Sequence, residues 1–358
     1  MLHGAIKQRK SLSGARPLRV LIIDDSAVAR AALSRMLSGE ADFEVVAALD
    51  GARRAIDWLA THRTDIILLD IQMPGLDGLA ALPELIAAGH GAHILIVSTL
   101  AETGARATIE ALALGATDTL AKPAVGELGG RFAALLVDRL RRLGEAAPRE
   151  AGDPGSEPFI LRPVSQAPLA CLAIGASTGG LHALAAFFAT LPCDFDPPIL
   201  VTQHLPTAFM PFFAEQLARM SGRHCTVAAD GAPLVRGAIL VAPGDAHLGC
   251  VLRRGAVRAE LLTHAVASRC RPSVDPMFET MAVVFGSAAM GVVLTGMGRD
   301  GASGAAAIVE AGGSVIAQDA ASSAVWGMPG AVSRAGLASV IAPPAKLARH
   351  VAQCGVRS

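Results

Sequence analysis

The sequence predicts an α/β protein built from two doubly wound parallel-sheet domains. Short and continuously apolar segments recur, such as 66–69, and unbroken apolarity marks strands that are buried on both faces of a parallel sheet. These segments alternate with stretches of helical spacing in both halves of the chain, as expected for α/β domains. A stretch rich in proline, glycine and charge, 144–158, separates the two halves as an exposed linker.

The composition of the 358 residues fits two packed domains and narrows the class of protein. Hydrophobic residues make up 52% of the chain and charged residues 17%, so each domain can bury a sizeable core. Lysine plus arginine equals aspartate plus glutamate, 31 each, which gives no overall attraction to nucleic acid or to acidic membranes. We therefore expect no nucleic acid among the partners.

The cysteine pattern and the apolar segments indicate a cytoplasmic protein. The six cysteines are scattered without a Cys-x-x-Cys pair, which predicts neither a disulfide framework nor a zinc site. The basic N-terminus is followed by only four apolar residues, 20–23, so no signal peptide is predicted. The uncharged stretch 280–298 contains four glycines and predicts a buried helix end, a turn and a buried strand, without direct membrane insertion.

Domain boundaries follow from these changes in composition. We predict a flexible N-terminal tail over 1–18, a first domain over 19–138, a linker over 139–167 and a second domain over 168–354. The first domain reads as five strand–helix units. Its predicted strands cover 20–23, 43–48, 64–69, 93–97 and 117–121.

Polar side chains follow the predicted strands of the first domain. Asp24 and Asp25, Asp70, Ser98 and Lys122 come at four strand ends, where doubly wound sheets bind their ligands. Three carboxylates that converge repel one another unless a hard divalent cation lies among them, and Mg²⁺ suits an all-oxygen site. A lysine and a hydroxyl beside such a cluster indicate a bound phosphoryl group, and an aspartate can be the nucleophile that accepts it.

The first domain resembles the response-regulator receiver family over residues 19 to about 136. The resemblance rests on Asp24-Asp25, Asp70-x-x-Met73-Pro74-Gly75, Ser98 and Lys122-Pro123. One position departs from the family pattern, because Thr119 stands where many receivers carry an aromatic switch residue.

The resemblance implies that Asp70 accepts a phosphoryl group from a histidine kinase. It also implies that Lys122 contacts that group and that Ser98 hydrogen-bonds to it. The implied Mg²⁺ ligands are the carboxylates of Asp24, Asp25 and Asp70 and the backbone carbonyl of Gln72.

The second domain is organised around a glycine-flanked serine, Ser177, in the segment 174–180. An apolar strand, 169–174, precedes the segment, and a predicted helix, 181–191, follows it. The Gly-x-Ser-x-Gly spacing matches a nucleophile held on a tight strand-to-helix corner. The same glycines also fit a closely packed turn or a phosphate-binding loop.

A serine nucleophile needs a base, and the base needs an orienting acid. His204 ends the continuous apolar strand 198–203, and Asp300 follows the predicted strand 292–295. We prefer His204 as the base because no loop separates it from its strand, whereas spacing alone does not separate the aspartates. The competing candidates for base and acid are His182, His247, Asp245 and Asp319.

Residues 168 to about 350 resemble the catalytic domain of the CheB family, the chemotaxis protein-glutamate methylesterases. The matching segments are 174–180, 202–206, 242–247, 271–275, 294–301 and 327–329. The resemblance implies Ser177 as nucleophile, His204 as general base and acid, and Asp300 as the residue that orients His204. The backbone amide of Met297 would contribute to an oxyanion hole, and the esterase would need no cofactor.

The family implies a phosphorylation-activated response regulator that hydrolyses glutamate methyl esters on the cytoplasmic helices of chemoreceptors and also deamidates glutamines. A paralogous enzyme of a non-chemotactic signalling array is the alternative. A DNA-binding regulator would need a basic recognition helix after the linker, and none is present. A dinucleotide-binding oxidoreductase would need Gly-x-Gly-x-x-Gly and an acidic residue at the next strand end, where this chain has His204.

Overall fold

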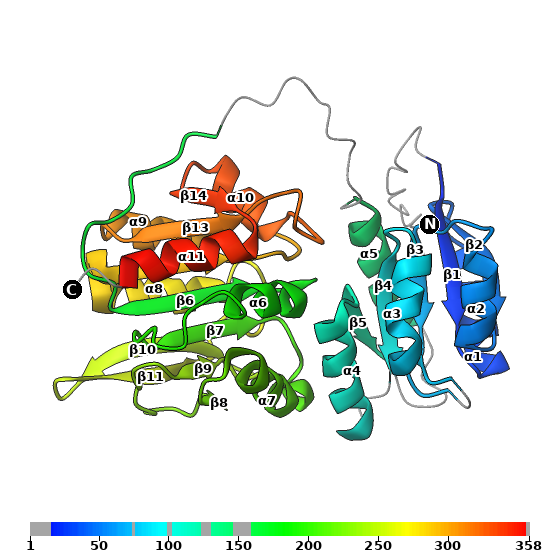
Figure 1. The fold of residues 1–358 in the computed structure, drawn as a ribbon, viewed down its shortest axis with the longest axis horizontal. Coiled ribbons are helices and arrows are strands. Elements are labelled where there is room, and N and C mark those ends of the chain that lie inside the picture. The colour runs from blue at the N-terminus through cyan, green and yellow to red at the C-terminus, as the bar shows by residue number, and fades with distance from the viewer. Residues whose placement is uncertain (1–15, 74–75, 99–101, 123–129, 146–158, 356–358) are drawn as a thin grey trace, which may run out of the picture. The chain divides into compact units, whose positions relative to one another are not determined.

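The computed structural model describes residues 16–73, 76–98, 102–122, 130–145 and 159–355. The chain divides into two compact units, each with its own sheet (Figure 1). The first unit comprises 1–99 and 119–145, and the second comprises 100–118 and 146–358. Residues 1–15 of the predicted tail and the middle of the predicted linker, 146–158, lie outside the described residues.

The first unit contains a five-stranded sheet in the order β2-β1-β3-β4-β5. The strands are β1 (Leu18–Ile23), β2 (Phe43–Leu49), β3 (Ile66–Leu69), β4 (His93–Ser98) and β5 (Asp118–Ala121). The helices of this unit that alternate with the strands along the chain are α1 (Ala27–Ser38), α2 (Ala52–Leu59), α3 (Gly78–Ala88) and α5 (Gly130–Glu145). Helix α4 (Glu102–Leu114) lies between β4 and β5 in the chain and belongs to the second unit. Helix α5 continues past residue 138, so the boundary predicted there falls inside a helix.

The register of the first sheet aligns the ends of its central strands. Strand β1 pairs in parallel with β3, and Ile23 is opposite Leu69. All four residues of β3 are buried, as the continuous apolar run predicts. Asp24 and Asp70 directly follow these paired residues and therefore leave the sheet side by side at its carboxyl edge.

The second unit contains a seven-stranded sheet in the order β14-β13-β12-β6-β7-β9-β8, with parallel pairing throughout. The strands are β6 (Cys171–Ala176), β7 (Ile199–Gln203), β8 (Cys225–Val227), β9 (Ile239–Val241), β12 (Ala289–Val293), β13 (Ser314–Gln318) and β14 (Val340–Ala342). The short edge strand β14 is an addition to the sequence prediction. Strands β12, β6 and β7 occupy the centre of the sheet.

Helices lie on both sides of this sheet (Figure 1). Helix α8 (Val274–Phe285) packs against β6, against α9 (Ala302–Glu310) and against the hairpin strand β10 (His247–Arg253), and its side chains Met277, Phe278 and Met281 are fully buried. A second set of helices packs together through α6. This set consists of α6 (Gly180–Phe188), α7 (Met210–Ser221) and α11 (Pro344–Gly355). Helix α10 (Met328–Arg334) packs instead against α9 and β13.

The alternating pattern of 250–262 around Arg253-Arg254-Gly255 predicts an antiparallel hairpin at the edge of the second sheet. The structure contains this hairpin, which begins at His247. Strands β10 and β11 (Ala256–Leu262) pair antiparallel through the turn Arg254-Gly255, where both residues have positive φ angles of 52° and 78°. This backbone matches the right-handed twist of the flanking strands. The hairpin forms a two-stranded sheet of its own rather than an edge of the seven-stranded sheet.

The uncharged stretch 280–298 contains the predicted helix end, turn and buried strand, but the helix end is not fully buried, since Val283 is 86% exposed. It contains the end of α8, a short turn and strand β12, whose five residues are all buried. In the part of the chain that the structure describes, no helix combines the length and the apolar character needed to cross a bilayer.

Candidate active site

The first unit brings three carboxylates together at the carboxyl edge of its sheet. Oxygen atoms of Asp24, Asp25 and Asp70 all lie within 4.8 Å of one another. Asp24 is 1% exposed and Asp70 9%, while Asp25 is exposed. Such an all-oxygen set, partly open to solvent, fits a hard cation that keeps some of its waters.

Lys122 lies between two of these carboxylates. Its Nζ atom donates to Oδ2 of Asp24 at 2.8 Å and to Oδ2 of Asp70 at 2.5 Å. Burial raises the pKa of Asp70, and the lysine only partly opposes this effect. Burial also lowers the pKa of Lys122, but the two carboxylates outweigh it and raise that pKa overall. The lysine therefore stays charged and offsets the repulsion between the aspartates.

The other predicted residues of this cluster lie on the neighbouring strands. Ser98 is the last residue of β4 and is 2% exposed, and its carbonyl accepts a hydrogen bond from the backbone N–H of Lys122 at 2.7 Å. Gln72 follows β3, and its backbone N–H donates to Oδ1 of Asp70 at 3.3 Å. Thr119 is buried within β5. Pro74, Gly75 and Pro123 of the predicted motif lie outside the described residues.

In the second unit, Ser177 directly follows the central strand β6. Its backbone N–H donates to the carbonyl of Thr295 at 3.0 Å, and its carbonyl accepts from Nε2 of Gln203 at 2.8 Å. Gly179 has a φ of 74°, so the corner needs glycine there, whereas Ser177 is not among the described residues with positive φ. The backbone conformation that requires glycine therefore lies at Gly179, two residues after the serine.

Glycine is also required at position 296 because the backbone passes close to the serine. A Cβ atom added to Gly296 would lie 2.7 Å from Cβ of Ser177 and 2.4 Å from Sδ of Met328. This close approach brings the loop after β12 beside the serine. The loop extends from Leu294 to Gly301 and contains both Met297 and Asp300.

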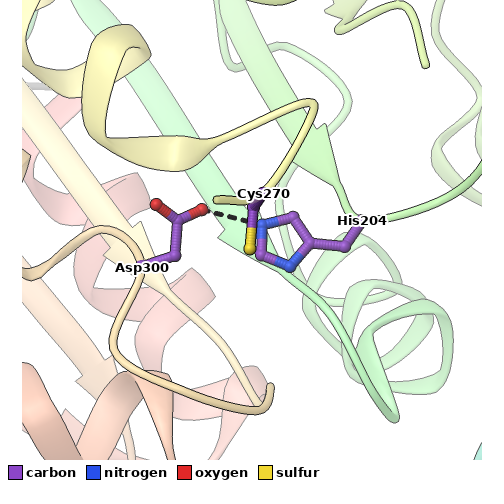
Figure 2. Close-up of side chains that lie close together, drawn as sticks. All are labelled: His204, Cys270 and Asp300. Atoms are coloured by element: carbon purple, nitrogen blue, oxygen red, sulfur yellow. Dashed lines mark hydrogen bonds and ion pairs between the residues drawn. The ribbon is translucent and has the colours of Figure 1, made fainter. Parts of the chain in front are cut away.

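His204 directly follows β7, and its backbone N–H donates to the carbonyl of Ala176 at 3.2 Å. Its Nε2 atom lies 2.7 Å from Oδ2 of Asp300. Figure 2 marks this contact with a dashed line. Burial lowers the pKa of His204, but the hydrogen bond with Asp300 and the nearby Cys270 outweigh it and raise the pKa to about 9. The structure therefore pairs these two predicted residues through a strong, charge-assisted contact.

Asp300 is 1% exposed and has several donors. Besides His204, its Oδ1 accepts from the hydroxyl of Ser273 at 2.6 Å, and its Oδ2 accepts from the backbone N–H of Val274 at 2.7 Å. Burial raises the pKa of Asp300, but these hydrogen bonds and the charge of His204 hold it well below its usual range. Asp300 is therefore an ionised carboxylate in a fixed orientation.

The bond to Asp300 leaves Nδ1 as the ring nitrogen of His204 that can exchange a proton with a hydroxyl. In the described part of the chain, no hydrogen bond joins the Ser177 hydroxyl to His204. Catalytic hydrogen bonds are often long before substrate binds, so this geometry is compatible with a nucleophile and its base.

The competing candidates have other surroundings. Nδ1 of His247 accepts from the backbone N–H of Ser273 at 2.9 Å, and its Nε2 lies 3.0 Å from the carbonyl of His264. One ring nitrogen thus accepts and the other donates, as in a neutral imidazole. Burial also lowers the pKa of His247 below its ordinary value. His182 and Asp245 are exposed, and Asp319 accepts from the backbone and hydroxyl of Ser322.

Met297 lies in the same loop as Asp300 and is 9% exposed. The neighbouring Gly296 is held on both sides, since it donates to Val325 and accepts from Gly327 and Met328. Within the described residues, the backbone N–H of Met297 has no acceptor. An amide that is held in place and unsatisfied beside a serine can donate to a developing oxyanion.

Sequence reasoning missed the functional position of Ser273. This residue is the N-cap of α8, where a serine side chain ordinarily accepts from the first turn of the helix. Here the hydroxyl makes no capping bond and donates to Asp300 instead. The signal in the sequence, a serine before an apolar helix, was indistinguishable from an ordinary cap.

Comparisons with known proteins agree with this geometry. The family profile described as CheB methylesterase matches residues 172–351, and the profile described as response regulator receiver domain matches residues 20–129. The chain is 42% identical over 342 residues to a protein-glutamate methylesterase/protein-glutamine glutaminase 2 of Caulobacter vibrioides, covering 94% of this chain and 98% of that protein.

The chain belongs to the CheB methylesterase family.

A further member of the family, from Azospirillum brasilense, is 38% identical over 373 residues, which is 97% of this chain and 95% of the relative. The crystal structure of the CheB catalytic domain of Thermotoga maritima matches with a TM-score of 0.50 and 35% identity, over 52% of this chain and 98% of that domain. The receiver domain implies Mg²⁺-dependent phosphorylation in general. None of these names favours the non-chemotactic alternative.

Proposed function

We propose that this chain is a phosphorylation-activated response regulator that hydrolyses glutamate methyl esters on chemoreceptors. The observation that carries the proposal is the 2.7 Å contact between His204 and Asp300 at the sheet edge that also holds Ser177. The proposed roles apply to a receiver that extends through α5 to Glu145, a linker that follows it, and a catalytic domain over 168–354.

The esterase mechanism follows from the positions of these groups. Nδ1 of His204 takes the proton of the Ser177 hydroxyl, and the serine oxygen attacks the γ-carbonyl carbon of the methyl ester. Asp300 stabilises the imidazolium that forms. The backbone N–H of Met297 donates to the carbonyl oxygen as it becomes negative. His204 then protonates the departing methoxide, methanol leaves, and the acyl-enzyme remains.

Hydrolysis of the acyl-enzyme uses the same groups in the reverse direction. His204 takes a proton from water, the hydroxide attacks the acyl carbon, and Ser177 leaves with the proton from His204. The product is a glutamate carboxylate. The same steps act on a glutamine side chain with ammonia as the leaving group, which accounts for the second activity in the relatives' names. The substrates would be the cytoplasmic helices of chemoreceptors, which places the reaction in the cytoplasm.

The receiver would supply the control. Asp24, Asp25, Asp70 and the carbonyl of Gln72 would hold a Mg²⁺ ion, which supplies charge neutralisation around a phosphoryl group. A carboxylate oxygen of Asp70 attacks the phosphorus of a phosphohistidine on a chemotaxis histidine kinase, and the histidine leaves. Lys122 gives up its contact with Asp70 and binds one oxygen of the phosphoryl group. The hydroxyl of Ser98 donates to a different oxygen of that group.

The test is methanol release from methylated chemoreceptor membranes, measured with and without acetyl phosphate and Mg²⁺. We expect slow release that rises on phosphorylation, and none from Ser177→Ala. The matched control is Ser333→Ala, because the Ser333 hydroxyl is also buried but bonds only within α10, to the carbonyl of Pro329. Equal release by the wild type and Ser177→Ala would contradict the proposed nucleophile.

A further inference from the structure

A cysteine thiol lies against the paired histidine and aspartate of the second unit. Cys270 comes from the loop between β11 and α8, and its Sγ, a ring nitrogen of His204 and a carboxylate oxygen of Asp300 all lie within 4.8 Å of one another. Figure 2 shows the sulfur beside the edge of the imidazole that faces Asp300. The steps proposed for ester hydrolysis do not use this thiol.

The three groups form a ligand set of a particular chemical kind. An imidazole nitrogen, a thiolate and a carboxylate are the ligands of tetrahedral Zn²⁺ sites, with bonds of about 2.0–2.3 Å. Ligand atoms of such a tetrahedron are about 3.3–3.8 Å apart, so small side-chain rotations would bring these atoms into place. The cluster of Asp24, Asp25 and Asp70 offers only oxygen ligands. A thiophilic metal therefore prefers the site that contains the sulfur of Cys270.

The surroundings of the cluster hold two of the ligands in place. Oδ1 of Asp300 accepts from the hydroxyl of Ser273, and the backbone N–H of Cys270 donates to the hydroxyl of Ser268 at 3.3 Å. Hydrogen bonds of this kind orient metal ligands. His204 and Cys270 are both partly exposed, so a cation can enter from solvent and retain a water as its fourth ligand.

Three of the other cysteines compete poorly for a metal. Burial raises the pKa of Cys225 and of Cys250 to about 12, and it raises the pKa of Cys171 as well. A thiol that stays protonated is a weak ligand. Among the described residues, Cys270 is the cysteine that lies in a group of three potential metal ligands.

We propose that His204, Cys270 and Asp300 bind a thiophilic divalent cation of the Zn²⁺ class, and that the bound cation inhibits hydrolysis. The thiol proton and the proton on the coordinating ring nitrogen leave to solvent, and a thiolate, a carboxylate and a neutral imidazole then balance the two positive charges. The bound His204 no longer pairs with Asp300 as a base. Metal binding itself is independent of the proposed function, whereas the inhibition rests on it.

The cysteine spacing gave no indication of this site, because its ligands come from three separate segments. His204 follows β7, Cys270 precedes α8, and Asp300 follows β12. Only the folded sheet brings them together. The absence of Cys-x-x-Cys pairs predicts no zinc site, but that pattern reports only sites with two neighbouring cysteines.

The experiment measures binding on the full-length protein, first stripped of metal and then supplied with excess Mg²⁺ so that the aspartate cluster is occupied. Co²⁺ serves as the spectroscopic probe and Zn²⁺ as its competitor. We expect a sulfur-to-cobalt charge-transfer band in the wild type that Zn²⁺ removes. Cys270→Ser should lose the band and bind Zn²⁺ at least about 10-fold more weakly, since loss of even an outer hydrogen-bond partner costs that much.

Cys193→Ser is the matched control, because Cys193 is the exposed cysteine of the described chain and lies outside both ligand clusters. It should keep the band and the wild-type affinity. A band of wild-type intensity in Cys270→Ser, or no band in the wild type, would overturn the site. The band also identifies sulfur as a ligand without reference to catalysis.

Inhibition is tested separately, with each variant compared with its own metal-free rate of methanol release. Zn²⁺ should inhibit the wild type and Cys193→Ser, and should inhibit Cys270→Ser only at concentrations at least about 10-fold higher. Zn²⁺ binding without loss of rate would overturn the inhibitory role. A metal-free wild type that releases no methanol, yet shows the cobalt band, would contradict the proposed function and leave the metal site standing.

Discussion

The hydroxyl of Ser273 donates a 2.6 Å hydrogen bond to Oδ1 of Asp300. Ser273 is fully buried, and its backbone N–H in turn donates to Nδ1 of His247. His247 therefore fixes the serine that orients the aspartate. This arrangement turns a rival candidate for the general base into a residue that positions the aspartate through Ser273.

Ser273→Ala should lower kcat/KM for methyl-ester hydrolysis by roughly 10-fold, since a hydrogen bond to a charged group contributes about 1.5–3 kcal/mol and two other donors to Asp300 remain. Steady-state methanol release checks this value. Ser333→Ala serves as the control, because it removes a similarly buried hydroxyl that does not contact the site. Equal kinetics in both variants would show that Ser273 does not position Asp300.

Ser177→Ala and His204→Ala should each reduce turnover by several orders of magnitude. The two residues act in the same step, so the double variant should be little slower than either single variant. Asp300→Asn should be severe but milder by about one or two orders of magnitude, as in other triads. Losses that multiply in the double variant would contradict a shared proton transfer between the serine and the histidine.

The pH–rate profile should report the raised pKa of His204. The base must be neutral to accept the serine proton, so kcat/KM should rise with pH up to the region of about 9. Asp300→Asn removes the negative charge that stabilises the imidazolium, while burial still disfavours the positive charge of the ring. The rising limb should therefore move to lower pH while the maximum rate falls. An unshifted limb would show that another group sets the profile.

The same ion pair should make the stability of the catalytic unit depend on pH. The folded-state pKa of His204 is above the unfolded value of 6.5, so its stabilisation is fully present below pH 6.5 and is lost as pH rises through about 9. The midpoint temperature of thermal unfolding should therefore decrease more in the wild type than in Asp300→Asn as the pH rises through this window. Parallel curves for the two proteins would mean that the pair contributes no linked stability.

Asp70→Asn should fold normally and resist phosphorylation, because an amide is not a nucleophile toward phosphorus. Incubation with acetyl phosphate and Mg²⁺ should label the wild type alone, and methanol release should rise in the wild type alone. Asp77→Asn is a suitable control, since Asp77 caps α3 and lies outside the carboxylate cluster. Labelling of Asp70→Asn at the wild-type level would move the phosphorylation to another residue.

The fold was largely predictable because its strands are local features of the sequence. The strand before Asp70 is continuously apolar and the strand before His204 is apolar over 199–201, and the structure confirms both strands as fully buried. Parallel strands place their ends at one edge, so the convergence of Asp24, Asp70 and Lys122 could be expected before the structure was known.

Other parts of the site could not be predicted from local patterns. Asp245, Asp300 and Asp319 all follow strands, and only the neighbour order β12-β6-β7 brings Asp300 to His204. The positions of Ser273 and Cys270 depend on how the loop before α8 folds back over the sheet. That path is set by tertiary packing, which neither periodicity nor residue spacing encodes.

The central place of the three site strands has a consequence for how the enzyme loses activity. Strands β12, β6 and β7 each have hydrogen-bonded neighbours on both sides, and two further strands flank them at either edge. Backbone amides of such strands exchange with solvent deuterium only when a whole cooperative region opens. Fraying of β8 or β14 should leave the active-site geometry intact, so denaturant should abolish hydrolysis only together with global unfolding of this domain.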